Sequence, residues 1–137
     1  MSVRIPVRRL QKICNPFESS PWDTPLSIHD IECAIKTKRF VEPNDVGGAY
    51  DHAGRIAYLV KSGWDDPIEV DVGVPILNYY TDWVIQDGNH RFAAALYRKS
   101  RYISASVAGQ LDYARDLFGV DCDEPMEEPR KNDCEGG

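Results

Sequence analysis

The sequence predicts an α+β domain, a small mixed sheet with flanking helices, and three observations favour this class. Segments with helical periodicity alternate along the chain with short segments in which apolar and polar residues alternate. The 137 residues suit one domain, and a composition of 42% apolar and 28% charged residues is that of an ordinary soluble protein. The chain has no run of about 18 apolar residues, so we expect no membrane partner.

The first half of the chain predicts one edge strand followed by two helices. Pro6 fits a strand at a sheet edge, because an edge strand does not need every N–H group for pairing. Ser27 and Asp30 form a variant capping box at the start of the first helix. Asp51 can cap the second helix, and Gly63 ends it. The elements expected here are a strand over residues 4–10, a loop over 14–25, a helix from 27 to about 38, a loop over 41–50 and a helix over 51–63.

The second half predicts three strands and two helices. Ile68, Val70 and Val72 alternate with acidic residues, as in a strand with one buried face. Gly88 allows a tight turn from a short strand into a helix rich in alanine. Gly119 ends the last helix. The elements expected here are strands over residues 68–74, 83–86 and 102–108, and helices over 89–98 and 111–118.

The net charge of −6 is concentrated at one end of the sequence. Residues 121–137 hold seven acidic and two basic residues and few apolar ones, so we expect a domain over 1–120 and a disordered acidic tail over 121–137. The body is close to neutral, which argues against a protein that coats DNA by charge alone. Four cations within the first twelve residues favour a solvated strand edge over a nucleic-acid site. The sequence has no apolar stretch typical of a signal peptide, so we expect a cytoplasmic protein.

The segment from Asp87 to Arg91 carries the strongest functional signal. It follows a strand and opens a helix, so the free N–H groups of the first helical turn point toward any ligand placed there. His90 and Arg91 stand in that turn, where positive charge opposes the helix dipole unless an anion lies nearby. Asp87 can hold a metal ion or accept a proton. The residues alone leave a second interpretation equally open, in which Arg91 pairs with Asp87 and His90 makes an ordinary hydrogen bond.

This segment resembles the G-x-[HR]-R-x-x-A-A turn of the ParB/sulfiredoxin superfamily. The likeness extends to the opening IPVRRL with Asn15-Pro16 and to a helix, a glycine and a P-I-x-V strand over residues 59–70. Residues 103–107 resemble the family's I-P-A-x-V strand, with Ser104 at the proline position. It covers residues 4–109 in the order of the family's elements. The resemblance implies a ParB/sulfiredoxin-like fold over residues 1–120, with a nucleotide whose phosphates rest on the turn.

The resemblance also implies roles for single residues. It assigns Gly88, Asn89, His90 and Arg91 to nucleotide binding, places Asp87 near Mg²⁺ or as a base, and leaves Lys61 and Trp64 as further nucleotide contacts. Asn89 stands where sulfiredoxins have a catalytic cysteine, so sulfinic acid reduction is not expected. Free serine kinases of the superfamily share the D-G-x-H-R turn and use an acid from the loop after the first strand. Glu18 lies in that loop, so the candidate catalytic residues are Asp87, His90 and Glu18.

The expected function is nucleotide binding, with ATP or CTP and Mg²⁺ as cofactors. The chemistry would be phosphotransfer or nucleotide hydrolysis, although the sequence leaves open whether the protein is an enzyme. The alternative is a non-enzymatic DNA-associated or partner-binding accessory protein of plasmid or phage type. We expect the helix-turn-helix and dimerisation domains of partitioning ParB proteins to be absent, and the charge does not support DNA as a partner. Asp65 and Asp66 are expected to cap a turn rather than to join a metal site.

Overall fold

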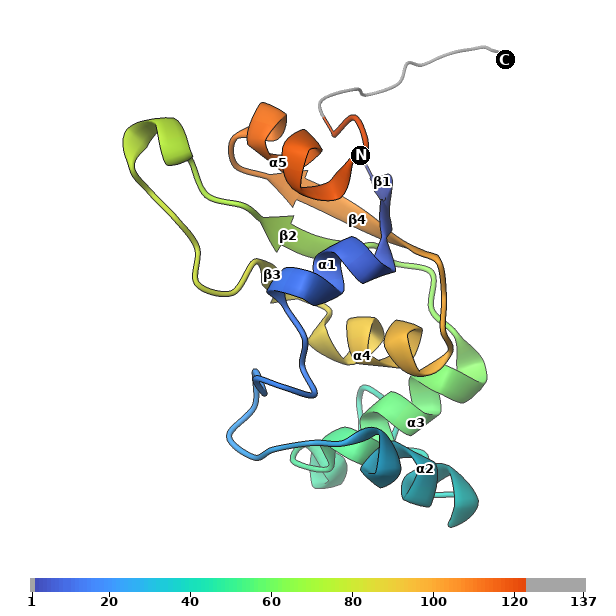
Figure 1. Cartoon of the computed structure of the whole chain (residues 1–137). Coiled ribbons are helices and arrows are strands. Elements are labelled where there is room, and N and C mark those ends of the chain that lie inside the picture. Colours follow the sequence, from blue (N-terminus) through green and yellow to red (C-terminus); the bar gives the residue numbers. More distant parts are fainter. Residues whose placement is uncertain (1, 123–137) are drawn as a thin grey trace, which may run out of the picture.

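The computed structural model describes residues 2–122 and confirms the predicted α+β class (Figure 1). Its sheet has the strand order β1-β4-β2-β3. Strand β4 pairs parallel with β2 and antiparallel with β1, and β2 pairs antiparallel with β3. The predicted tail lies outside the described residues from position 123 onward. The strands are β1 (Val3–Pro6), β2 (Ile68–Asp71), β3 (Ile85–Asp87) and β4 (Tyr102–Ala108).

The prediction of a strand over residues 4–10 is wrong beyond Pro6. Strand β1 lies at a sheet edge as predicted, but the chain turns at Pro6 into helix α1 (Val7–Ile13). The φ of −60° at Pro6 suits the residue that precedes a helix, and no N–H group is lost there. Val7 and Leu10 are three residues apart, so the helix buries both on one face, which a strand could not do.

The predicted helix caps form as expected. Ser27 and Asp30 make both hydrogen bonds of the capping box at the start of α2. The Asp51 carboxylate accepts the Gly54 N–H at 3.0 Å at the start of α3, and Gly63 ends that helix. Two short 3₁₀ turns, η1 and η2, were not predicted. The remaining elements are α2 (Ile28–Lys36), η1 (Val46–Gly48), α3 (His52–Ser62), η2 (Pro75–Leu77), α4 (Asn89–Tyr97) and α5 (Leu111–Phe118).

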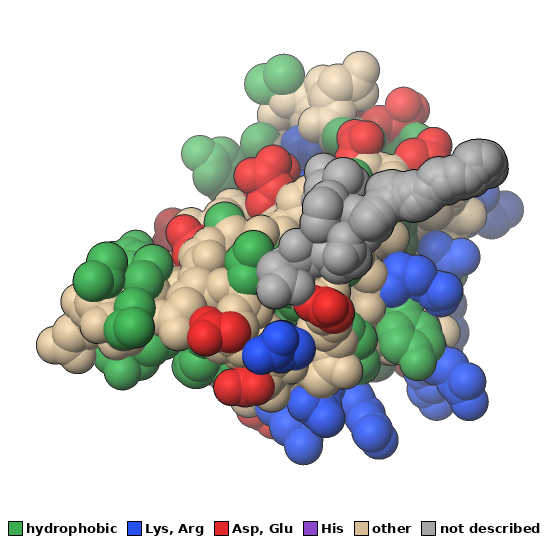
Figure 2. All heavy atoms as spheres, turned by 90° about the horizontal axis from the view of Figure 1, so that it is seen from above, with side chains coloured by type: hydrophobic (Ala, Val, Ile, Leu, Met, Phe, Trp, Pro, Cys, Tyr) green, Lys and Arg blue, Asp and Glu red, His purple; other side chains and the backbone are tan. Residues whose placement is uncertain are grey.

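The connection between β2 and β3 projects beyond the end of the sheet (Figure 1). It carries η2 and is closed by an antiparallel bridge between Val74 and Tyr79. Apolar side chains gather at this end of the molecule, at the left of Figure 2. We call residues 74–80 the tip loop.

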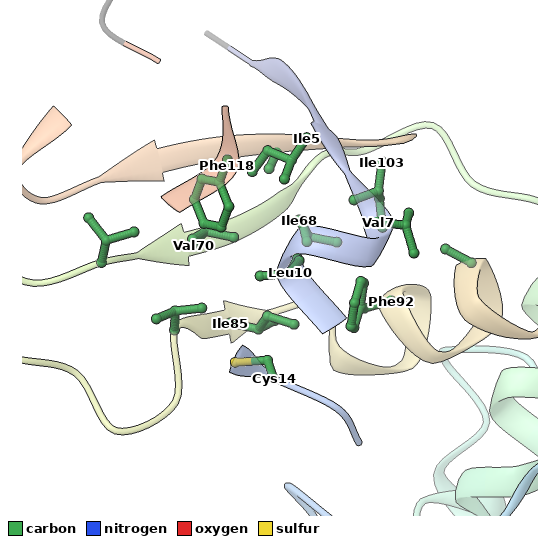
Figure 3. Packing of buried hydrophobic residues seen from close by; sticks show 14 of the residues in the cluster. Ile5, Val7, Leu10, Cys14, Ile68, Val70, Ile85, Phe92, Ile103 and Phe118 are labelled. Carbon is green, nitrogen blue, oxygen red and sulfur yellow. The ribbon is translucent and has the colours of Figure 1, made fainter. Parts of the chain in front are cut away.

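The main hydrophobic core lies between one face of the sheet and helices α1, α4 and α5. Leu10, Phe92 and Phe118 project from these three helices toward the strands (Figure 3). The opposite face of the sheet is open and carries exposed Glu69 and Ser104. The strand side chains in this core are Ile5, Ile68, Val70, Ile85, Ile103 and Ala105.

Helix α4 lies between the sheet and a second layer made of α2 and α3. Its Phe92 and Ala95 belong to the sheet core, whereas Ala93 and Ala94 pack with Ile56 of α3. Small alanines on two faces let both layers approach the helix closely, which explains why this helix is alanine-rich. None of the helices found in residues 2–122 combines the length and the apolar character needed to cross a membrane.

Candidate functional site

The turn from β3 into α4 depends on the missing side chain of Gly88. Its φ of +102° lies in the left-handed region, and a Cβ built there would come within 2.4 Å of Ile68 Cγ2. Gly88 therefore brings the start of α4 against the middle of the sheet. Gly88 occupies the N-cap position, so no side chain caps the helix and no acidic residue stands in its first turn. The first N–H groups of α4 are left for another acceptor.

Arg91 fixes this turn to the segment that enters β2. Its Nη1 donates to the carbonyl oxygens of Asp66 and Pro67 at 2.9 and 3.0 Å, and its Nη2 contacts the Asp87 carboxylate at 3.2 Å. The Arg91 side chain is only 17% exposed, whereas that of Asp87 is 67% exposed. The pairing of Arg91 with Asp87 that the residues left open is therefore present, and it occupies one edge of the guanidinium.

His90 belongs to a stack of three rings. Its Nε2 lies 3.0 Å from Nδ1 of His52, and Trp22 stacks on both imidazoles at centroid distances of 4.8 and 5.0 Å. Burial, with the nearby charges of His52 and Arg55, lowers the pKa of His90 to about 4. Burial also lowers the pKa of His52, against the opposing effect of Asp51. At neutral pH the pair is uncharged, so one ring donates and the other accepts.

A cavity of about 670 Å³ opens onto this turn. Three groups of residues enclose it: the loop before α3, one face of α3 with the segment that follows it, and the β3–α4 turn. Its charged lining consists of Arg55 and Arg91 together with the carboxylates of Asp65, Asp66 and Asp87. The lining residues are Val41, Pro43, Arg55, Tyr58, Leu59, Ser62, Gly63, Trp64, Asp65, Asp66, Asp87, Gly88, His90 and Arg91.

Arg55 holds the loop that forms one wall of the cavity. Its guanidinium donates to four backbone carbonyl oxygens, at distances from 2.8 to 3.2 Å. The side chain therefore cannot swing freely, and its charge is fixed beside the cavity. Such a preorganised cation needs no reorganisation when an anion binds. The four acceptors are the carbonyls of Glu42, Pro43, Asp45 and Gly48.

The structure brings together some of the predicted site residues and separates others. Asp87, Gly88, His90, Arg91 and Trp64 all line the cavity. The three other predicted site residues, Asn89, Lys61 and Glu18, do not line the cavity. Asn89 accepts the Trp83 indole N–H at 2.7 Å, Lys61 lies 4.7 Å over the Phe40 ring, and Glu18 lines a different hollow beside α1.

Sequence reasoning gave no role to Tyr58 and Ser62, and it left Arg55 open between a phosphate contact and a solvated side chain. Arg55, Tyr58 and Ser62 follow the spacing i, i+3 and i+7 on α3, so they share one helix face. That polar face was a usable signal. Asp65 and Asp66, expected to cap a turn, line the cavity instead. Trp22 gave no local signal, because its partners His52 and His90 are far from it along the chain.

The cavity does not form a complete metal site by itself. Among residues 2–122, no group of three or more histidine, cysteine, aspartate or glutamate side chains is placed to hold a metal ion. Asp65, Asp66 and Asp87 are nevertheless oxygen donors of the kind that Mg²⁺ accepts. Mg²⁺ is commonly bound by one or two carboxylates together with the phosphates of a substrate. The donors present fit a metal ion that arrives with a nucleotide.

Comparison of the chain with family models, with curated proteins and with solved structures finds no match. The fold and the site therefore rest on the observations above. The resemblance to the ParB/sulfiredoxin superfamily stays a prediction from the motifs.

Proposed function

We propose that the protein binds a nucleotide in the cavity, with the phosphates at the N-terminus of α4. The observation that carries the proposal is that a cavity of about 670 Å³ opens directly on an uncapped helix start. That volume lies within the range of sites for small molecules and cofactors. The N–H groups of Asn89, His90 and Arg91 would supply the phosphate contacts, since anions are favoured at the positive end of a helix dipole.

The charged residues would support this site in two ways. Arg55 donates to four carbonyl oxygens, and Arg91 donates to two carbonyl oxygens and to Asp87, so both are held in place and contribute fixed positive charge beside the cavity. Asp65 and Asp66 would repel a bare phosphate but would attract a phosphate carrying Mg²⁺. ATP or CTP with Mg²⁺ is therefore the ligand class that we propose. The Trp64 ring, which also lines the cavity, offers a surface for the base.

Phosphotransfer or nucleotide hydrolysis is the chemistry that we propose for this site. Asp87 is the stronger candidate for the base, since its carboxylate is mostly exposed and stands at the end of β3. A pKa of about 4 makes His90 a weak base at neutral pH, so its role would be to position the turn. Glu18 lines a separate hollow, and we do not include it in the reaction.

The test is a thermal-shift panel of ATP, CTP, GTP and pyrophosphate, each with and without Mg²⁺. A ligand that binds only the folded state raises the melting temperature, and a ligand at 100 times its Kd adds about 2.7 kcal/mol of stability. We expect at least one nucleotide to stabilise the wild type in Mg²⁺. The shift is read against each variant's own ligand-free melting temperature, which removes purely structural effects.

The Asp66→Asn variant separates the two ways of binding. If Mg²⁺ bridges the carboxylate and the phosphates, the variant loses affinity in Mg²⁺. If the phosphate binds without metal, the variant gains affinity because a repulsive charge is removed. Glu69→Gln is the matched control, since Glu69 is an exposed carboxylate on the open face of the sheet and lines no part of this cavity. No stabilisation by any member of the panel would reject nucleotide binding.

A further inference from the structure

The tip loop exposes four large apolar side chains within five residues. Ile76 and Leu77 are 79% and 75% exposed, and the rings of Tyr79 and Tyr80 are more than half exposed. Single exposed apolar residues are normal, but a contiguous group of them marks an interaction site. Apolar side chains gather at this end of the molecule in Figure 2.

The backbone of the tip loop is ordered by the molecule itself. Val74 and Tyr79 exchange both N–H···O bonds, at 2.8 and 3.2 Å, and the Ile76 N–H donates to the Gln110 side chain at 2.9 Å. Thr81 Oγ1 donates to the Asp71 carbonyl oxygen at 2.7 Å at the base of the loop. The apolar side chains are therefore presented by a preorganised loop, so a partner would not have to order the backbone on binding.

Two exposed acidic residues, Asp82 and Asp112, flank the tip loop. No lysine or arginine occurs between residues 68 and 90, whereas Asp82 is exposed next to the loop. Asp112 is also exposed and accepts the Gln110 Nε2 hydrogen at 2.9 Å, and that same Gln110 side chain holds the Ile76 N–H. A partner surface should accordingly be apolar at its centre and basic at its rim.

The same chain carries such a surface elsewhere. A hollow of about 440 Å³ lies where α1, the loop after it, and the ends of α2 and α4 meet, and we call it the α1 groove. Val7, Phe17, Ile28 and Leu96 supply its apolar lining. Its basic residues are Arg8 and Lys99, both exposed, and Glu18 is its one acidic residue. No ion pair of Arg8 or Lys99 occurs within residues 2–122.

We propose that the tip loop of one molecule docks in the α1 groove of a second copy of this chain. The apolar tip would fill the apolar groove, while Asp82 and Asp112 would face Arg8 and Lys99. The loop extends away from the sheet edge, on the side far from α2 and α3, so it is free to reach another molecule (Figure 1).

Sedimentation velocity over a concentration series tests the proposal with the full chain. We expect the wild type to associate with rising concentration, and we expect salt to weaken the association because the outer contacts are charged. Leu77→Asp removes the centre of the tip, and Ile28→Asp removes that of the groove. Each is expected to raise the dissociation constant about tenfold or more, as loss of a central apolar anchor does.

Two features keep these variants informative. Leu77 is largely exposed, and Ile28 is a half-exposed residue in the first turn of α2, where an acidic side chain suits the helix dipole. Both variants should therefore fold, and circular dichroism checks this. If Leu77→Asp does not fold, Leu77→Ser takes its place in the experiment. Val46→Asp is the matched control, because Val46 is 87% exposed on another loop and should leave association unchanged.

The decisive experiment mixes the Leu77→Asp variant with the Ile28→Asp variant. Leu77→Asp keeps an intact groove and Ile28→Asp keeps an intact tip, so one complete contact forms only between unlike molecules. We expect the mixture to associate with a dissociation constant at least about tenfold lower than that of either variant alone. A wild type that stays monomeric at every concentration it reaches would overturn the proposal and would assign the tip loop to a different protein. A mixture that fails to associate, or a Val46→Asp control that abolishes association, would overturn it as well.

Discussion

The β3–α4 turn and the tip loop each follow a strand of the sheet, but they present opposite chemistry. At the first turn, Gly88 lets the backbone press against Ile68, and the polar N–H groups of α4 open on a cavity. At the second, the backbone bonds are satisfied within the loop and apolar side chains face outward. The difference indicates that the first region is suited to a small polar ligand and the second to another protein surface.

The largest expected effect on stability comes from Gly88→Ala. The new Cβ would meet Ile68 at 2.4 Å in a backbone conformation that side chains disfavour, so we expect a loss of about 2–4 kcal/mol. Urea denaturation measures it. Gly47→Ala is the control, since a Cβ there meets only Asp45 at 3.4 Å and the position has no left-handed φ. Equal effects at the two glycines would show that the turn is not under this constraint.

Arg91→Ala should be the next most damaging change. It removes two hydrogen bonds to backbone carbonyls and the contact with Asp87, and we expect a loss of about 2–3 kcal/mol. Arg101→Ala removes an exposed arginine and should change stability by less than about 0.5 kcal/mol. Thermal or urea unfolding of both variants checks the contrast. An unchanged Arg91→Ala protein would mean that the guanidinium does not fix the turn.

The ring stack predicts a pH-dependent stability. The pKa of His90 is lowered from the ordinary 6.5 to about 4, so the unfolded chain holds more protons than the folded protein between these values. Stability contributed by neutral His90 is complete above pH 6.5 and is lost as the pH falls toward 4. We expect a loss on the order of 3 kcal/mol over this range, reduced in His90→Gln.

The smallest effect on the free energy of unfolding is expected from a substitution in the tip loop. Leu77→Ser changes an exposed side chain whose backbone bonds stay in place, so monomer stability should shift by less than about 0.5 kcal/mol. The measurement is urea unfolding at a concentration low enough to exclude association. A loss comparable to that of Gly88→Ala would mean that the tip residues pack within the fold and are not held for a partner.

Local chemistry explains which parts of the fold the sequence could predict. The capping box of Ser27 and Asp30, the Asp51 cap and the stop at Gly63 depend on residues a few positions apart, and all of them form. The change from strand to helix at Pro6 was missed, because the few apolar residues after it fit the spacing of a strand as well as that of a helix. Only packing against the core, which buries Val7 and Leu10 on one face, selects the helix.

In the candidate site, too, the sequence could predict only the features that depend on neighbouring residues. The turn at Gly88 follows from local sequence, and it lies at a cavity. The contact of His90 with His52 joins residues 38 positions apart, and the four carbonyl bonds of Arg55 depend on the path of a loop, so no local pattern encodes either. The sequence predicts a loop at Tyr79 and Tyr80, with rings that could stack on a base, but their joint exposure with Ile76 and Leu77 is a property of the folded molecule that no local pattern encodes.

The most direct test of nucleotide binding follows the amide resonances of the protein during a nucleotide titration by NMR. With ATP or CTP and Mg²⁺, we predict the largest shift changes at the N–H groups of Asn89, His90 and Arg91, with smaller changes at the Trp64 indole and at Ser62. Resonances of the tip loop should stay in place. An absence of shifts, or shifts confined to residues outside the cavity, would contradict the assignment of a phosphate site to the start of α4.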